Sequence, residues 1–421
     1  LLLLGRLELG LRHVDLEVLH GVVQILQLHL VGLGDALVQI GALARQIIDS
    51  PPEVTGSTTN QVLLVTDPGI VKAGHADRVR RNLESVGLDV SVFDKVNENP
   101  ATADVDAWRA VARRHSPDLI VGLGGGSSMD TAKGCNFILT NGGRMEDYWG
   151  VGKAARPMLP LIAIPTTAGT GSECQSFALI AKEDSHMKMA CGDPKAAPRV
   201  ALLDPTLTLT QPRLVTADTG IDAIAHAVET AVTTKRNALS LLYARESFKL
   251  TAHSIERVLE APDDLEARGR MLLGAAYAGI AIENSMLGGA HAAANPLTAH
   301  YDVIHGQAVG IMLPPVVRFH AQDEETRAHY AELARIGNLT NGNCAAAGAG
   351  DRLVRHIEQL LDSADIAPGI GDYGVKPDLI PTMAAEAAEQ WTAAFNPRPI
   401  GADSFERLYA AALDGRAVAR A

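Results

Sequence analysis

The apolar positions of this chain follow one pattern in its first half and a different pattern in its second half. Between 61 and 211, short apolar runs alternate with longer amphipathic stretches. The runs at 62–65, 90–93 and 119–122 predict buried strands, and the stretches at 72–86 and 104–115 predict helices. Such alternation is typical of a mostly parallel sheet with helices on its faces. We therefore predict an α/β domain over 32–211, with ligands at the carboxyl ends of its strands.

After Pro212 the strand signals fade, and helical periodicity or good helix formers take over. Helices are predicted over 217–232, 236–259, 264–286, 306–319, 323–338, 350–362, 377–393 and 403–415. This run of helices predicts a second domain, all-helical, over 212–421.

Residues 1–31 form an atypical segment that fits neither pattern. Alternating leucines indicate strands there, and a turn followed by a helix is predicted from 32 to 43. His20, Gln24, Gln27 and His29 interrupt the longest uncharged run, which argues against a transmembrane helix. We find no basic stretch followed by an apolar core and a cleavage site, as a signal peptide would require.

Composition restricts the partners. With 37 basic and 49 acidic residues the formal charge is −12, which argues against nucleic acid or an anionic membrane as a partner. The four cysteines show no CxxC spacing, so they are interpreted as scattered reduced thiols of a cytoplasmic protein.

Two polar stretches follow predicted strands of the first half. The stretch 123–133 contains three glycines, Gly124 to Gly126, and Ser127 before a helix, which lets backbone N–H groups approach a pyrophosphate. The stretch 163–173 collects Thr166, Thr167 and Thr170 with two glycines, which suits hydrogen bonds to a cofactor. A tight connection and a plain Ser/Thr loop remain the alternatives.

Asp67 lies just past the strand 62–65. A carboxylate there could accept the hydroxyls of a ribose and would repel a 2′-phosphate. It therefore favours NAD over NADP.

The stretch 220–229 carries the chemistry of the second half. Ile221, Ile224 and Val228 form an apolar stripe at helical spacing. Asp222 and His226 are four residues apart on another face, where both could bind one metal ion. His291 and His305 follow downstream. Taken alone, the pair could equally be a surface hydrogen bond.

Together these segments resemble the iron-containing (group III) alcohol dehydrogenases, which have a dehydroquinate synthase-like fold. The resemblance runs from about residue 32 to the end and rests on several motifs in order: 124–133, 165–173, 203–209, the Asp222/His226 helix, His291, His305-Gly306 and Asn396-Pro397-Arg398. It implies a dinucleotide-binding α/β domain, an all-α domain and a site in the cleft between them. It also implies the metal ligands Asp222, His226, His291 and His305, and the cofactor-binding residues Gly125, Gly126, Ser127, Asp130, Thr166, Thr167, Thr170 and Lys188.

The function implied is a metal-dependent, NAD(H)-linked alcohol dehydrogenase or aldehyde reductase, which transfers hydride between nicotinamide and a small alcohol or carbonyl compound. Three imidazoles and one carboxylate suit Fe²⁺, Zn²⁺ or Mn²⁺, with Fe²⁺ favoured by the family. A homodimer is common in the family. The alternatives are a metal-independent reductase like the maleylacetate reductases, which would lack the ligand set, and a lyase like dehydroquinate synthase.

One position departs from the family pattern. Many members have a second histidine four residues after the third ligand, and this chain has Asn295. Asparagine can orient a substrate but cannot relay a proton. We therefore expect either that Asn295 holds the substrate or that a proton path uses His300 or water, and both residues are candidate catalytic residues.

Overall fold

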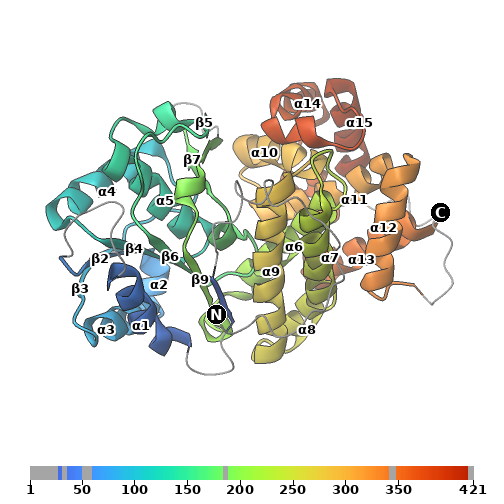
Figure 1. The fold of residues 1–421 in the computed structure, drawn as a ribbon. Helices are drawn as coiled ribbons and strands as arrows, with labels where there is room; N and C mark the ends of the chain where they lie inside the picture. Colours follow the sequence, from blue (N-terminus) through green and yellow to red (C-terminus); the bar gives the residue numbers. More distant parts are fainter. Residues whose placement is uncertain (1–26, 31–35, 50–58, 184–187, 341–347, 416–421) are drawn as a thin grey trace, which may run out of the picture.

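The computed structural model describes residues 27–30, 36–49, 59–183, 188–340 and 348–415. Two halves lie side by side in Figure 1: an α/β half, blue to green, and a helical half, yellow-green to red. Both predicted fold classes are thus confirmed. Of the atypical segment 1–31, only 27–30 falls within the described residues, and these form the strand β1 (Gln27–Leu30), as the alternating leucines predicted.

The α/β half is built on a six-stranded parallel sheet. Its order is β1-β9-β6-β4-β2-β3, with β2 (Gln61–Val65), β3 (Asp89–Phe93), β4 (Leu119–Gly124), β6 (Leu161–Pro165) and β9 (Val200–Leu203). The four inner strands β9, β6, β4 and β2 are almost wholly apolar because both faces of the sheet are covered. Helices α1 (Ala36–Asp49) and α3 (His75–Glu84) share one core with the sheet, and α4 (Thr102–His115) and α5 (Gly126–Asn141) share the other.

The chain changes direction across the sheet between β2 and β4. It runs from β2 to β3 on one side, then returns to place β4 on the other side of β2. At such a switch point the connections diverge and leave a crevice at the carboxyl ends of the strands, where ligands bind in open α/β sheets. Asp67 follows β2, and the glycine-rich turn follows β4, so both lie at this crevice.

A small second sheet was not predicted. Its order is β5 (Gly150–Val151), β8 (Lys188–Gly192), β7 (Phe177–Ala181), with β7 and β8 antiparallel. The predicted helix over 72–86 is also wrong at its start, because Gly74, with φ of 80°, separates α2 (Pro68–Lys72) from α3.

The helical half begins with α6 (Arg213–Thr230). The helices that follow are α7 (Ala238–Thr251), α8 (Ser254–Glu260), α9 (Leu265–Ser285), α10 (Gly289–Tyr301), α11 (His305–His320), α12 (Glu324–Ile336), α13 (Ala349–Ser363), α14 (Ile380–Glu389) and α15 (Ala402–Leu413). The stretches 236–259 and 377–393, each predicted as one helix, are broken, and α10 was not among the predicted helices. Among the described residues, no helix combines the length and the apolar character needed to cross a bilayer.

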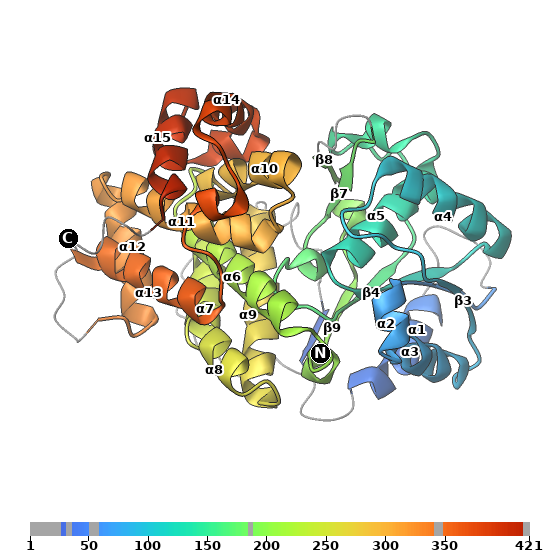
Figure 2. The same ribbon diagram turned by 180° about the vertical axis from the view of Figure 1, so that it is seen from behind.

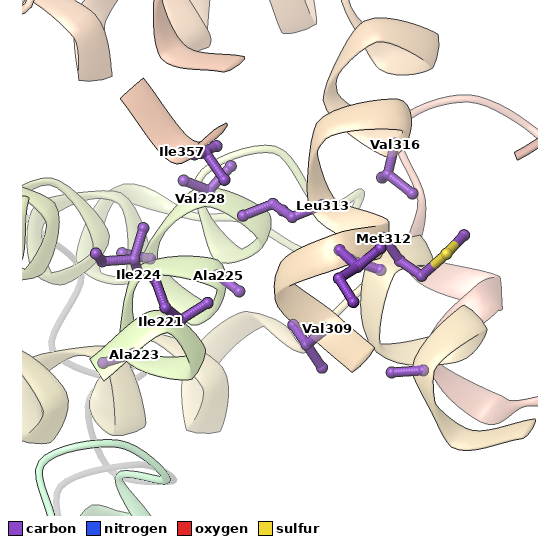
Figure 3. Packing of buried hydrophobic residues seen from close by; sticks show 14 of the residues in the cluster. Ile221, Ala223, Ile224, Ala225, Val228, Val309, Met312, Leu313, Val316 and Ile357 are labelled. Carbon is purple, nitrogen blue, oxygen red and sulfur yellow. The ribbon is translucent and has the colours of Figure 1, made fainter. Parts of the chain in front are cut away.

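Helix α6 lies in the middle of the helical core. Its predicted stripe of Ile221, Ile224 and Val228 is buried, and Ile221 and Val228 lie on the side toward Val309 and Leu313 of α11 (Figure 3). The two helices approach closely because α11 has a glycine at 310, where an added Cβ would lie 2.6 Å from Ile221 Cγ2. This packing fixes the face of α6 that carries Asp222 and His226.

The halves meet where α9 crosses the 3-10 helix Ser172–Cys174 of the α/β half. Gly171 and Gly279 are in backbone contact there, and a Cβ on Gly171 would lie 2.6 Å from Gly279 Cα. Seen from behind, α6 lies on the side of the helical half that faces the α/β half (Figure 2). A Cβ on Gly169, in the loop after β6, would lie 2.6 Å from Cβ of Thr219 on α6. The loop after β6 therefore runs next to the start of the helical half.

Candidate active site

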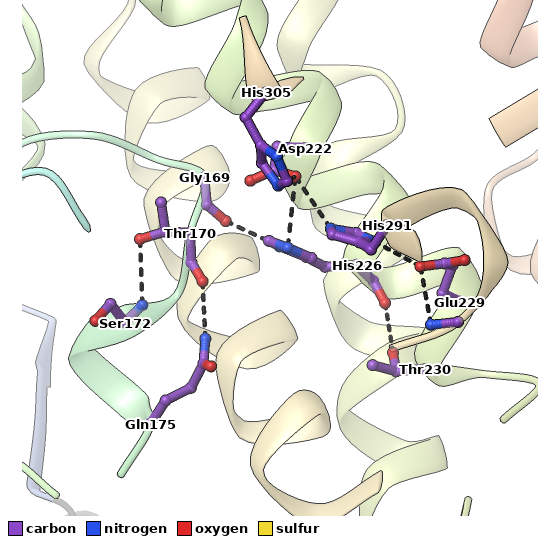
Figure 4. Close-up of polar contacts among 11 residues, drawn as sticks. Gly169, Thr170, Ser172, Gln175, Asp222, His226, Glu229, Thr230, His291 and His305 are labelled. Atoms are coloured by element: carbon purple, nitrogen blue, oxygen red, sulfur yellow. Dashed lines mark hydrogen bonds and ion pairs between the residues drawn. The ribbon is translucent and has the colours of Figure 1, made fainter. Parts of the chain in front are cut away.

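Four polar side chains from three helices converge in the helical half. Asp222 and His226 stand one turn apart on α6, His291 is at the third position of α10, and His305 begins α11. The Asp222 Oδ1 atom lies 3.3 Å from His291 Nε2, 3.5 Å from His226 Nε2 and 4.0 Å from His305 Nε2. Figure 4 shows the imidazoles of His226 and His291 turned toward this one carboxylate. The structure thus brings all four predicted ligands together.

The buried atoms of this cluster lack partners. Among the described residues, Asp222 Oδ1 and His291 Nε2 have no hydrogen-bond partner of acceptable geometry, although both are buried. Leaving such groups unpaired in the interior costs free energy. One atom each from Asp222, His226 and His291 lies within 4.8 Å of the other two. The set fits a single divalent cation, to which nitrogen and oxygen donors of this kind bind.

The opposing charges perturb the pKa values of the cluster. Burial by itself raises the pKa of the Asp222 carboxyl, but the three imidazoles, His226 first, together hold it well below its usual range. Burial lowers the pKa of His291, but the neighbouring carboxylates of Asp222 and Glu229 outweigh burial and raise that pKa to about 9. Burial, followed by the charge of Lys188, lowers the pKa of His305 to about 3. Such strongly shifted groups gathered in one place are typical of functional sites.

Each of the two stacked imidazoles is also held from its other side. His226 Nδ1 lies 3.2 Å from the carbonyl oxygen of Gly169, to which it donates, so the loop after β6 reaches the α6 side chain. His291 Nδ1 lies 2.5 Å from Glu229 Oε2. Sequence reasoning missed Glu229. The available signal was a glutamate three residues after His226, which directly follows the apolar pair Ala227-Val228 in the same helix.

The glycine-rich turn and the threonine loop adjoin at the crevice of the sheet. Gly125 is the N-cap of α5, without a side-chain cap. A Cβ on Gly125 would lie 3.3 Å from Thr167 Cγ2, and one on Gly126 would lie 2.8 Å from Thr170 Cγ2. Thr166 donates its backbone N–H to Gly124 O at 2.9 Å. The free N–H groups that begin α5 suit an anion such as a pyrophosphate.

Asp67 lies beside this turn, as its position after β2 predicted. Its Oδ1 accepts from the backbone N–H groups of Gly69 and Ile70 at 2.9 and 3.0 Å, which makes Asp67 the N-cap of α2. Its Oδ2 accepts from Ser128 Oγ at 3.3 Å. The side chain is half-buried. The carboxylate is therefore held in one orientation at the edge of the crevice.

The remaining cofactor candidates lie at and behind the turn. Ser127 Oγ accepts from Asn99 N at 3.3 Å. Asp130 is buried and accepts from Ser172 Oγ at 2.7 Å, in a group with the buried ammonium of Lys133. Lys188, at the start of β8, is half-buried, and its charge acts on both Asp130 and Asp222.

The two candidate catalytic residues on α10 have different surroundings. Asn295 is half-buried one turn beyond His291, and its Nδ2 donates to Gln390 Oε1 at 2.9 Å. His300 is exposed at the far end of the helix, where its Nε2 lies 2.7 Å from Glu386 Oε2 on α14. The structure thus places Asn295 on the helix face of a candidate ligand and pairs His300 with a carboxylate outside the cluster.

Comparisons with known proteins agree with these features. The family described as iron-containing alcohol dehydrogenase matches residues 44–205, and the one described as Fe-containing alcohol dehydrogenase family, C-terminal, matches residues 216–413. Alcohol dehydrogenase 4 of Schizosaccharomyces pombe is 34% identical over 367 residues, which cover 87% of this chain and 86% of that protein.

Two further similarities concern a bacterial enzyme and a crystal structure. The NAD-dependent methanol dehydrogenase of Bacillus methanolicus is 34% identical over 339 residues, covering 80% of this chain and 88% of that one. The crystal structure of a 1,3-propanediol oxidoreductase superposes with a TM-score of 0.85 at 29% identity, covering 93% of this chain and 98% of that one. Matching families over both halves, together with the cluster on α6, α10 and α11, show that this chain belongs to the iron-containing alcohol dehydrogenase family, metal-dependent oxidoreductases that act on CH–OH groups.

Proposed function

We propose that this enzyme transfers hydride between NAD(H) and a small primary alcohol or its aldehyde, which binds at a divalent ion, Fe²⁺ first among the candidates. The observation that carries the proposal is the convergence of Asp222, His226, His291 and His305 on one point beside the loop that lines the nucleotide crevice. An ion held there would supply Lewis-acid polarisation of the alcohol oxygen. Three imidazoles and one carboxylate carry a net charge that suits a divalent cation.

The α/β half supplies the cofactor site in this proposal. Gly125, Gly126 and Ser127 would bind the pyrophosphate at the start of α5, and Thr166, Thr167 and Thr170 would line the cofactor along the next loop. Asp67 would accept the ribose hydroxyls. Asp130 on α5 and Lys188 at the start of β8 would complete the cofactor site.

Asn295 has the role of orienting the substrate. Its amide is held by Gln390 on one side, and His291 lies one turn away on the same helix. An amide can donate to and accept from a hydroxyl without changing its charge. His300 has no role in the proposed chemistry, because it is exposed and paired with Glu386. The alcohol proton would then leave through water.

Several broader expectations belong to the same proposal. The two domains would be 32–211 and 212–421, with α6 starting at Arg213. A homodimer and a cytoplasmic location are carried forward from the family resemblance and from the scattered cysteines, of which Cys135, Cys174 and Cys191 are buried free thiols.

The test is a substrate screen on protein reconstituted separately with Fe²⁺, Zn²⁺ and Mn²⁺, following NADH absorbance. The panel starts with short primary alcohols and diols and their aldehydes, since two similar proteins are named for methanol and 1,3-propanediol. We expect turnover of at least one short alcohol, and we expect it to be faster with one of the three metals than with the other two. NAD-linked turnover that is equal with and without metal would contradict the metal role, and no turnover with any metal would contradict the substrate class.

A further inference from the structure

We infer that Glu229 is a positioning residue that holds His291 in the orientation and tautomer needed to bind the metal, an inference that rests on the proposed metal site. Glu229 lies on α6, three residues after His226 and seven after Asp222. It is 3% exposed, so its carboxylate has no access to bulk water and must be satisfied by protein groups.

Three donors satisfy it, and all of them belong to the segment that carries His291. Glu229 Oε2 lies 2.5 Å from His291 Nδ1 and accepts from Gly288 N at 3.1 Å, and Oε1 accepts from Ala290 N at 2.7 Å. The carboxylate thus binds a side chain and two backbone groups at the beginning of one helix. A single residue of α6 thereby ties the helix of the third candidate ligand to the helix of the first two (Figure 4).

The start of α10 offers both free N–H donors and space for this carboxylate. Gly288, the N-cap of α10, makes no side-chain cap hydrogen bond, so Glu229 supplies from another helix the acceptor that a cap residue normally provides. A negative charge is also favourable at this end of a helix. A Cβ on Gly288 would lie 3.1 Å from Glu229 Oε1, so glycine is what allows the close approach.

The contact decides the state of the imidazole. A carboxylate only accepts hydrogen bonds, so His291 Nδ1 must carry the proton. In the neutral ring, the form that ligates a metal, the lone pair is then on Nε2, which points at Asp222 Oδ1, 3.3 Å away. Carboxylates that accept from a ligating histidine fix its ring and raise its basicity, and their loss typically lowers metal affinity about 10–100-fold.

The test compares metal affinity in Glu229→Gln with that in Glu386→Gln. Glutamine keeps the size of Glu229 but turns an NH₂ group toward N–H donors, so the imidazole loses its fixed partner. Glu386→Gln is the matched control, because it weakens the other His–Glu pair of the same helix, 2.7 Å at His300, outside the cluster. Dissociation constants for Zn²⁺ and Co²⁺ are measured by chelator competition, with the Co²⁺ absorption spectrum and the unfolding of the metal-free proteins alongside.

We expect Glu229→Gln to bind both metals about 10–100-fold more weakly, with a changed Co²⁺ spectrum, and Glu386→Gln to bind them like the parent. If Glu229→Gln does not fold, Glu229→Asp, which keeps the buried charge with a shorter reach, must bind more weakly than Glu386→Gln. Parent-like affinity and spectrum in the folded Glu229 variant overturn the inference. A parent protein that binds no divalent metal overturns the proposed metal site itself, which is a different result.

Discussion

At the scale of single residues, a substitution of Asp67 tests the proposed preference for NAD. Its carboxylate lies at the edge of the crevice, oriented by Gly69, Ile70 and Ser128. Asp67→Asn keeps an N-cap side chain for α2 and removes the charge. We expect the preference for NAD over NADP, as a ratio of kcat/KM, to fall about tenfold, since the repulsion of a 2′-phosphate is lost. A wild type that already uses NADPH better than NADH would contradict this role for Asp67.

Substitutions of Asn295 test its proposed role in orienting the substrate. Asn295→Ala should lower kcat about tenfold, because one hydrogen bond that orients the alcohol is lost, and Asn295→His should add a pH dependence near the ordinary imidazole pKa of about 6.5. The measurement is kcat against pH on the preferred substrate. If both variants keep the wild-type rate and pH profile, position 295 takes no part in the chemistry.

The four candidate ligands could be predicted from the sequence. The residues that hydrogen-bond to His291 and Asn295 could not. Asp222 and His226 could be paired because the helix period joins residues four apart. His291 and His305 were added only through the family resemblance. Glu229 was missed because its partner His291 is 62 residues away, and Gln390 was missed because its partner Asn295 is 95 residues away. Contacts over such separations depend on helix packing, which leaves no local pattern.

At the scale of elements, the sequence pattern gave no helix where glycine and proline are present for the sake of packing between helices. Helix α10 was not predicted, since Gly288 is its N-cap, Gly289 is its first residue and Pro296 lies inside it. Both glycines are nonetheless needed for the close approach of Glu229 and Asn396. The sheet β5-β8-β7 was missed as well, because β5 has only two residues and β8 contains no β-branched residue.

The crossing of α9 with the 3-10 helix Ser172–Cys174 gives a test at this scale. A Cβ at Gly279 would overlap the backbone of Gly171, so Gly279→Ala should cost about 1–3 kcal/mol of unfolding free energy. Gly269→Ala, on the same helix, is the control, because its Cβ would meet only Pro205 Cγ at an ordinary 3.8 Å. Denaturant unfolding of both variants measures the difference. Equal stability of the two variants would show that the crossing is not tight.

At the scale of the whole molecule, the site depends on both halves. The α/β half supplies the crevice and the loop whose Gly169 carbonyl accepts from His226, and the helical half supplies the four candidate ligands. The change from strand-and-helix alternation to helices alone predicted two halves of these classes. The contact between the halves at Gly171 and Gly279 could not be predicted. A glycine in the sequence does not show which distant backbone segment packs against it.

The most direct test of the central claim is turnover of the preferred alcohol with NAD⁺, measured together with metal content, in metal-stripped wild type, reconstituted wild type and His226→Ala. We predict that the stripped protein is inactive, that added divalent metal restores turnover, and that His226→Ala loses both metal and turnover by orders of magnitude. The reason is that His226 is one of three imidazoles around Asp222 Oδ1, 3.5 Å from it. Full turnover in the stripped wild type, or in His226→Ala, would contradict the account.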